Sequence, residues 1–166
     1  MSGTGAAHLD PVEAAELTLG IAVTRWHREI SEALLNRALA AAGECGVPSP
    51  TVVRVAGALE LAVVAQQLAT DHDAVVALGA VVRGGTPHFD HVCDAVTAGL
   101  TRVALDEHTP IGNAVLTCDT VEQALDRCGL PGSNEDKGWA ATVAALDAAL
   151  VIKGLRHRAG PIGFYT

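Results

Sequence analysis

One short stretch of the chain, residues 83–90 with the sequence RGGTPHFD, combines residue types that can handle an anion and a proton. Its two adjacent glycines allow the backbone to approach a ligand closely. Thr86 is predicted to be the N-cap of a helix with Pro87 at its first position, so that free N–H groups face a bound anion such as phosphate. His88 would lie beside that anion, and histidine is the side chain that gives and takes protons near neutral pH. We therefore predict that His88 is an acid/base catalyst next to a phosphate site.

Two simpler interpretations of this stretch remain open from these residues alone. Gly-Gly-Thr-Pro is also typical of an ordinary turn that leads into a helix, and His88 could be a surface histidine. The spacing of His88, His91 and Cys93 suggests zinc. On a helix, however, Cys93 lies well off the face that the two histidines share, and no fourth ligand is nearby. We therefore expect no metal site.

Apolar runs of strand length alternate with segments of helical periodicity, and these elements must position the stretch. The predicted strands are residues 17–24, 51–57, 73–83 and 111–119, and the predicted helices are 26–45, 60–70, 87–106, 121–128 and 135–155. Strands that are apolar on both faces and alternate with helices form a parallel sheet covered on both sides. The sequence therefore predicts an α/β fold, a doubly wound three-layer α/β/α sandwich with a four-stranded parallel sheet. Ligands bind such sheets at the carboxyl ends of the strands, where residues 83–90 would lie.

The composition excludes several classes of partner and compartment. A formal net charge of −8 on 166 residues argues against nucleic-acid binding, which needs clustered lysine and arginine. The four cysteines are scattered without CxxC spacing and no signal peptide is evident, so we expect reduced thiols in a cytoplasmic protein. The longest apolar run, residues 74–82, is far shorter than the ~20 residues that span a bilayer, so we expect no membrane segment.

The chain is predicted to divide into three parts. Residues 1–16 lack an apolar period and are expected to form a flexible N-terminal arm that a neighbouring subunit could order. Residues 17–155 form the single globular domain, and residues 156–166 form a C-terminal tail.

Several segments, in the same order along the chain, resemble the lumazine synthase family. The most characteristic is ALGAVVRGGTPHFDHVCDAVTAGL at 77–100, and the others are TRWH (24–27), GALEL (57–61), NAVLT (113–117) and EQALDRCGLPGSNEDKG (122–138). The resemblance covers roughly residues 17–155 and implies a flavodoxin-like fold. It also implies a cofactor-free enzyme of riboflavin biosynthesis that joins 5-amino-6-(D-ribitylamino)uracil to 3,4-dihydroxy-2-butanone 4-phosphate.

Carried over by position, the resemblance assigns a role to each site residue. It makes His88 the acid/base catalyst and Trp26 a platform on which the pyrimidine ring stacks. It implies substrate contacts that fall into three groups: Ala58, Leu59 and Glu60 at the ribityl hydroxyls, Val81 and Val82 at the pyrimidine edge, and Gly85, Thr86 and Arg127 at the phosphate. In the family, the residues matching Asn113, Arg127 and Lys137 come from a neighbouring subunit, so a homo-oligomer, most simply a pentamer, is expected.

The sequence departs from the family pattern at a few positions. Family members often have proline where Ala62 stands, and phenylalanine at the positions of Trp26 and Asn113. The loop between Arg127 and Lys137 is longer than in many members. These changes affect ring binding and assembly, whereas the charged and acid/base positions are kept.

Two other functions compete with the enzyme. The same pocket could hold a flavin or lumazine without turnover, although a carrier of unphosphorylated ligands needs neither His88 nor a phosphate site. A generic flavodoxin-like binding or regulatory domain would leave Arg127 and Lys137 without a purpose.

Overall fold

The computed structural model describes residues 9–158 and alternates strands with helices along the whole of that range. The strands are β1 (Leu19–Thr24), β2 (Thr51–Val55), β3 (Ala74–Val82) and β4 (Ile111–Cys118). The helices are α1 (Arg28–Glu44), α2 (Leu61–Ala69), α3 (His88–Asp106), α4 (Val121–Leu125) and α5 (Lys137–Arg158), and a 3-10 turn, η1 (Ala58–Glu60), precedes α2. Each predicted strand and helix is present with small shifts at its ends.

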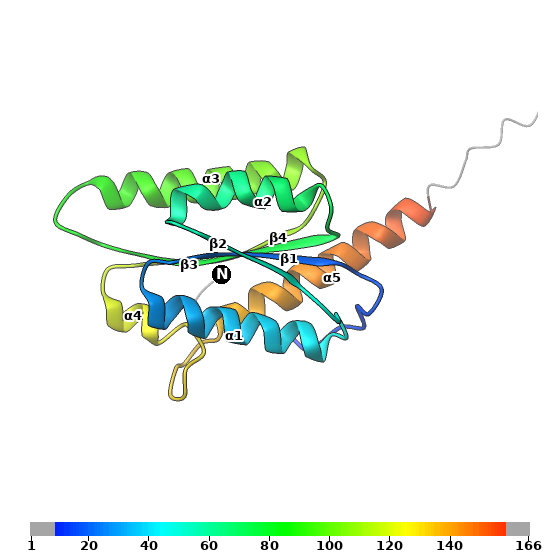
Figure 1. Ribbon diagram of the computed structural model, residues 1–166, viewed down its shortest axis with the longest axis horizontal. Coiled ribbons are helices and arrows are strands. Elements are labelled where there is room, and N and C mark those ends of the chain that lie inside the picture. The colour runs from blue at the N-terminus through cyan, green and yellow to red at the C-terminus, as the bar shows by residue number, and fades with distance from the viewer. Residues whose placement is uncertain (1–8, 159–166) are drawn as a thin grey trace, which may run out of the picture.

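The four strands form one parallel sheet in the order β2-β1-β3-β4. Helices α2 and α3 cover one face, whereas α1, α4 and α5 cover the other (Figure 1). Every residue of β1 is buried because both of its faces meet a helical layer. This confirms the predicted three-layer α/β/α sandwich, and the strand order is that of flavodoxin-like folds.

The order of the strands reverses between β1 and β3. The chain places β2 on one side of β1 and then crosses to place β3 on the other side. At such a switch point the loops that leave the two strands diverge, and they leave a crevice at the carboxyl ends. The segment after β1 and the segment after β3 therefore flank one crevice.

Part of the predicted N-terminal arm packs against the domain, and the boundary at residue 16 needs correction. Ala14 is fully buried, and its N–H donates to the carbonyl of Cys45 at 2.8 Å. Leu9 and Val12 pack against the core, and the indole Nε1 of Trp139 donates to the Leu9 carbonyl at 3.3 Å. Residues 9–16 are therefore not a flexible arm in this structure. Residues 1–8 lie outside the described part of the chain.

The C-terminal helix extends further than the sequence predicts, and it is apolar over most of its length. Helix α5 ends at Arg158 rather than at residue 155, and residues 159–166 lie outside the described part. By length and composition alone, it is the one helix in residues 9–158 that could cross a membrane. Its buried residues, including Val143 and Leu146, belong to the core cluster that also contains residues of α1 and β4. Core packing therefore accounts for part of its apolar character, since 33% of this apolar stretch is buried, whereas Val151 and Leu155 near its end are exposed.

The contact between β4 and α5 is close enough to exclude a side chain. A Cβ atom at Gly112 would lie 2.3 Å from the carbonyl oxygen of Ala141, which is a backbone atom that cannot rotate away. At Gly43, near the end of α1, an added Cβ meets nothing within 4 Å. These two glycines make a matched pair for testing the packing.

We expect Gly112→Ala to lower the free energy of unfolding by about 1–3 kcal/mol, because overpacking forces β4 and α5 apart. Gly43→Ala is expected to raise it by up to about 1 kcal/mol, because alanine restricts the unfolded chain. Urea unfolding of both variants at one protein concentration measures the difference. Equal stabilities for the two variants would contradict the close packing of β4 on α5.

Candidate active site

A cleft of about 320 Å³ opens at the carboxyl ends of the strands. Three segments line it, one after each of β1 and β2 and one that runs from the end of β3 into α3. Its lining residues are Trp26, His27, Gly57, Ala58, Leu59, Glu60, Ala80, Val81, Val82, Gly84, Thr86, His88, Phe89 and Val92. A cleft of this size suits a small organic ligand.

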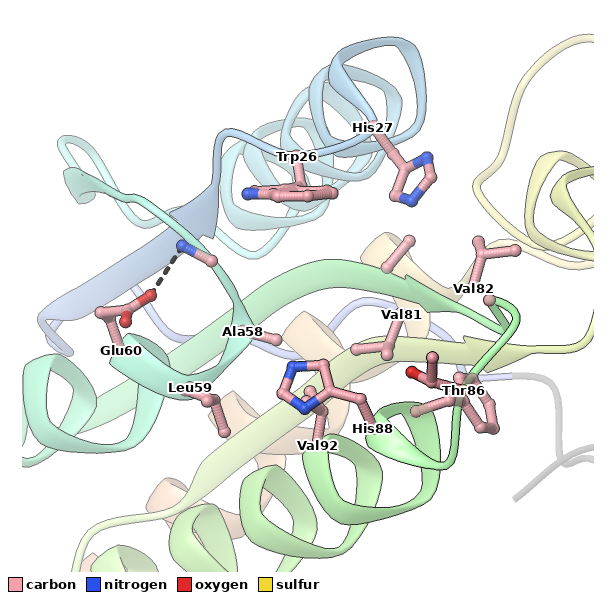
Figure 2. Close-up of a pocket in the computed structure, with 14 residues that line it drawn as sticks. Trp26, His27, Ala58, Leu59, Glu60, Val81, Val82, Thr86, His88 and Val92 are labelled. Atoms are coloured by element: carbon pink, nitrogen blue, oxygen red, sulfur yellow. Dashed lines mark hydrogen bonds between the residues drawn. The ribbon is translucent and has the colours of Figure 1, made fainter.

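Trp26 presents its ring to the cleft because the backbone turns sharply after β1. His27 adopts a left-handed conformation with φ of 49°, which is uncommon for a residue other than glycine. The buried Ser31 holds this turn, since its N–H donates to the His27 carbonyl at 3.0 Å and its hydroxyl lies within reach of the same oxygen. The Trp26 side chain is 68% exposed and lies along one side of the cleft (Figure 2). A large aromatic ring left so exposed provides a flat surface on which a planar ligand can stack.

The loop after β2 sets a carboxylate at the wall of the cleft. The N–H of Gly57 donates to Oε2 of Glu60 at 2.8 Å and so fixes the side chain across the short turn η1 (Figure 2). Ala58 and Leu59 lie in this turn, and Leu59 is half exposed toward the cleft. This wall therefore combines apolar contact with a carboxylate that can accept hydrogen bonds from hydroxyl groups.

The segment after β3 places His88 across the cleft from Trp26 (Figure 2). Helix α3 begins at His88 with Pro87 as its N-cap, and no side chain caps it. The prediction that Thr86 is the N-cap is therefore wrong, because the helix begins one residue later than expected and Thr86 lines the cleft instead. Uncapped N–H groups at a helix start favour a bound anion.

The sequence prediction and the observed lining differ in both directions. Gly84 lines the cleft, whereas the predicted Gly85 lies beside it in the same loop. Gly84 was predicted only as one of two glycines that allow close backbone approach, and five further residues that line the cleft were not predicted: His27, Gly57, Ala80, Phe89 and Val92. Their only signal was adjacency to strand ends, because most carry apolar or absent side chains that say nothing of chemistry.

Arg83 braces the loop that carries Thr86 and His88. Its Nε lies 2.7 Å from Asp119 and its Nη2 lies 3.1 Å from Asp90, while the guanidinium sits 4.2 Å from the centre of the Phe89 ring. The hydrogen bond to Asp119 and the charge of Asp90 raise the pKa of Arg83 above its ordinary value. The residue therefore remains charged and holds both carboxylates.

Three predicted residues lie outside the cleft of their own chain. Arg127 donates from Nη1 to the Gln123 carbonyl at 2.8 Å and pairs through Nε with Glu135 at 3.3 Å. Lys137 pairs with the same Glu135, so the fold brings the two basic residues together. Asn113 is exposed on β4, where its Oδ1 accepts the Val115 N–H at 2.9 Å. None of the three lines the cleft formed by residues 9–158 of one chain.

Thiol chemistry does not fit this site. The cysteines are free thiols, and burial raises the pKa of Cys118 and of Cys128, so both stay protonated at neutral pH. Burial and nearby carboxylates also raise the pKa of Cys93. Within residues 9–158, no group of three or more histidine, cysteine or carboxylate side chains is arranged to hold a metal ion. His88, His91 and Cys93 therefore do not form such a group.

The arrangement can stack a planar ring on Trp26, bind hydroxyl groups at Glu60, and hold an anion near Thr86 with His88 in reach of a proton. These three functions occupy one cleft although the residues come from three separate strand ends.

Comparison of the sequence with those of known proteins gives consistent matches. A sequence model of the family described as 6,7-dimethyl-8-ribityllumazine synthase matches residues 16–153. Curated relatives carrying that name include those of Saccharopolyspora erythraea, 63% identical over 99% of both chains, and Thermobifida fusca, 62% identical over 96% of this chain and 94% of the relative. A third, from Salinispora arenicola, is 59% identical over 99% of both chains.

A planar ligand in the cleft is expected to quench the fluorescence of Trp26. The chain's second tryptophan, Trp139, instead lies against Arg37 at 5.2 Å and provides the control. Titration with 6,7-dimethyl-8-ribityllumazine should quench wild type and Trp139→Phe but not Trp26→Ala. We expect Trp26→Ala to weaken binding by about 1–3 kcal/mol, the usual contribution of stacking, as measured by equilibrium dialysis. Unchanged binding in Trp26→Ala would exclude the stacking platform.

Proposed function

This chain belongs to the 6,7-dimethyl-8-ribityllumazine synthase family, and on that premise we propose that its cleft condenses 5-amino-6-(D-ribitylamino)uracil with 3,4-dihydroxy-2-butanone 4-phosphate. The product is 6,7-dimethyl-8-ribityllumazine, the precursor of riboflavin, and the reaction releases one phosphate and two water molecules. The observation that carries the proposal is the meeting of Trp26, Glu60 and His88 around one cleft. The free thiols agree with a cytoplasmic enzyme, which is where we expect it to act.

The pyrimidine substrate would bind between Trp26 and the opposite wall. Its ring would stack on the exposed indole, while the backbone of Val81 and Val82 would meet its polar edge. The ribityl chain would extend toward η1, where Ala58 and Leu59 give contact and Glu60 accepts hydrogen bonds from hydroxyl groups. This pose directs the reacting amine toward the α3 side of the cleft.

The phosphate of the second substrate would bind at the start of α3. The backbone of Gly85 and Thr86 and the uncapped N–H groups of the helix supply donors there. In an acidic chain, a fixed cation is also needed to hold a dianion. Arg127 would supply it from a neighbouring subunit, because it lies outside the cleft of its own chain.

His88 would move the protons of the reaction. Attack of the pyrimidine amine on the ketone gives an imine and water, and loss of a proton from the butanone carbon chain then expels phosphate. Ring closure by the ribitylamino nitrogen releases the second water. His88 lines the cleft with Thr86, at the end where we propose that the phosphate binds, so one side chain could take a proton and return it to a leaving group. Because amines and ketones condense unaided, holding the two substrates together supplies much of the acceleration.

The shared site requires an oligomer, and we propose a homopentamer as its basic unit. A heterologous contact repeated around a ring gives every subunit one neighbour that offers Asn113, Arg127 and Lys137 to its cleft. Arg127 and Lys137 both pair with Glu135, so the two cations lie close together and can be presented to a neighbour from one surface, which supports the proposed ring.

Purified protein supplied with both substrates should form lumazine and release one phosphate for each product molecule. We expect the rate to be unchanged after dialysis against a chelator, because the proposed proton and phosphate chemistry uses only side chains and backbone. Absorbance of the product and a phosphate assay measure the two yields. Binding of lumazine without turnover would instead support a carrier, and activity lost to the chelator and restored by zinc would overturn the metal-free mechanism.

Co-expression of His88→Ala and Arg127→Ala chains tests the shared site. In rings that mix at random, a site is intact when an Arg127→Ala chain supplies the groove and its neighbour, a His88→Ala chain, supplies the arginine. About one site in four should therefore recover, whereas each parent alone has none. Rates at saturating and limiting butanone phosphate measure the recovery.

Native mass spectrometry provides the control, because it reports the ring size and the mixing of chains. Mixed rings whose rate equals only the average of the two parents would contradict a shared site. A protein that remains monomeric at the assay concentration would contradict both the ring and the sharing.

A further inference from the structure

A continuous series of polar contacts links the helix that begins at His88 to Arg127. It starts in the first turn of α3, where Asp90 pairs with Arg83 at 3.1 Å. Arg83 also reaches the loop after β4 and donates from Nε to Asp119 at 2.7 Å. A single guanidinium thus ties the end of β3 to α3 and to the segment that leads into α4.

The second half of the series runs through Gln123 of α4. The N–H of Asp119 donates to the side-chain oxygen of Gln123 at 2.8 Å. The carbonyl of the same Gln123 accepts from Nη1 of Arg127 at 2.8 Å. The orientation of the Arg127 guanidinium therefore depends on where α4 sits relative to Asp119.

Arg83 is suited to connect α3 with the loop after β4 because its guanidinium group is planar and carries several N–H donors. It contacts two carboxylates on different elements while its face lies over Phe89, a residue in the first turn of α3. The backbone N–H of Arg83 also donates to the Cys118 carbonyl at 3.0 Å, and this bond does not depend on the side chain. A lysine would offer one point charge and could not reproduce this arrangement.

The ion pairs of Arg83 with Asp90 and Asp119 lie at the surface, so they contribute little to the stability of the fold. The side chains of Arg83, Asp90 and Asp119 are 44%, 59% and 64% exposed. Exposed ion pairs contribute little to the free energy of unfolding. Their main consequence is geometric, because they connect the glycine-rich loop after β3 to the segment that leads into α4.

We propose that Arg83 is a positioning residue for the phosphate of butanone phosphate in two active sites at once. Through Asp90 and Phe89 it sets the loop that carries Thr86 and His88 in its own cleft. Through Asp119 and Gln123 it sets Arg127, which enters the cleft of the neighbouring subunit. The inference rests on the shared site of the proposed function.

Arg83→Met is the first test, with Arg102→Met as the matched control. Arg102 also lies on α3 and pairs with a carboxylate, Asp106 at 2.9 Å, but both partners of this pair belong to α3. We expect Arg83→Met to raise the KM for butanone phosphate about five-fold or more, since small displacements of positioned groups cost binding steeply. The KM for the pyrimidine should change less than about two-fold, and Arg102→Met should leave both values unchanged.

Gln123 gives a second test that leaves Arg83 in place. Gln123→Met removes the acceptor for the Asp119 N–H, whereas Gln123→Glu retains one. We expect the KM for butanone phosphate to rise in the first variant and to return toward wild type in the second. An equal rise for both substrates in Arg83→Met and Gln123→Met would indicate general loosening and overturn the proposal.

The placement of Arg83→Met in mixed rings separates its two roles. The Arg83→Met substitution is introduced either into the Arg127→Ala chain, which supplies the groove of each restored site, or into the His88→Ala chain, which supplies Arg127. Both placements should raise the KM for butanone phosphate in the restored sites. A rise in only one placement would overturn the two-site role while the proposed reaction stands. If mixed rings of the His88→Ala and Arg127→Ala chains do not recover activity even when Arg83 is intact in both, the shared site is contradicted, and the two-site role of Arg83 is contradicted with it.

Discussion

The pairing of β1 with β3 at the centre of the sheet is the constraint on which the site depends. The two strands run parallel in a fixed register, Leu19 beside Ala74 through Val23 beside Leu78, and both are buried by helices on each face. Packing fixes the register, because a slip of one residue would turn every side chain to the opposite face, where it would have to fit a different layer of helices. The carboxyl ends of both strands therefore stop at the same edge, and the turn at His27 and the loop before His88 face one another across the cleft.

Charge is arranged so that a strongly acidic chain can still present cations. Glu135 pairs with both Arg127 and Lys137 and balances part of their charge. Arg83 is held between two carboxylates in the same way. Each cation is thus kept in a defined place by acidic neighbours. A phosphate that reached Arg127 would compete with Glu135, and binding would then favour a dianion over a single negative charge.

Close packing of small residues supports this geometry. Glycine at position 112 lets α5 approach β4 closely, and alanines fill much of the core around α1 and α5. Helix α5 begins at Lys137, so the packing of its buried face on β4 and α1 also sets one end of the segment that carries Arg127. The packing of α5 therefore connects the sheet to the segment that we propose enters the cleft of a neighbouring subunit.

The layers, the positions of the strands and helices, and many of the cleft residues could be predicted from the amino-acid sequence, because these follow from local periodicity and from short motifs at strand ends. Trp26, Glu60, Thr86 and His88 were predicted as site residues and line the cleft. Features that rest on contacts between distant residues or on backbone geometry could not be predicted in this way and are seen only in the folded chain. Leu9 meets Trp139, Arg83 meets Asp119, and His27 takes a left-handed turn, and no local pattern encodes such pairings or dihedral angles. The exclusion of Arg127 from the cleft of its own chain was expected from the family resemblance, but no local residue pattern encodes it, because side-chain reach depends on where α4 and α5 pack in space.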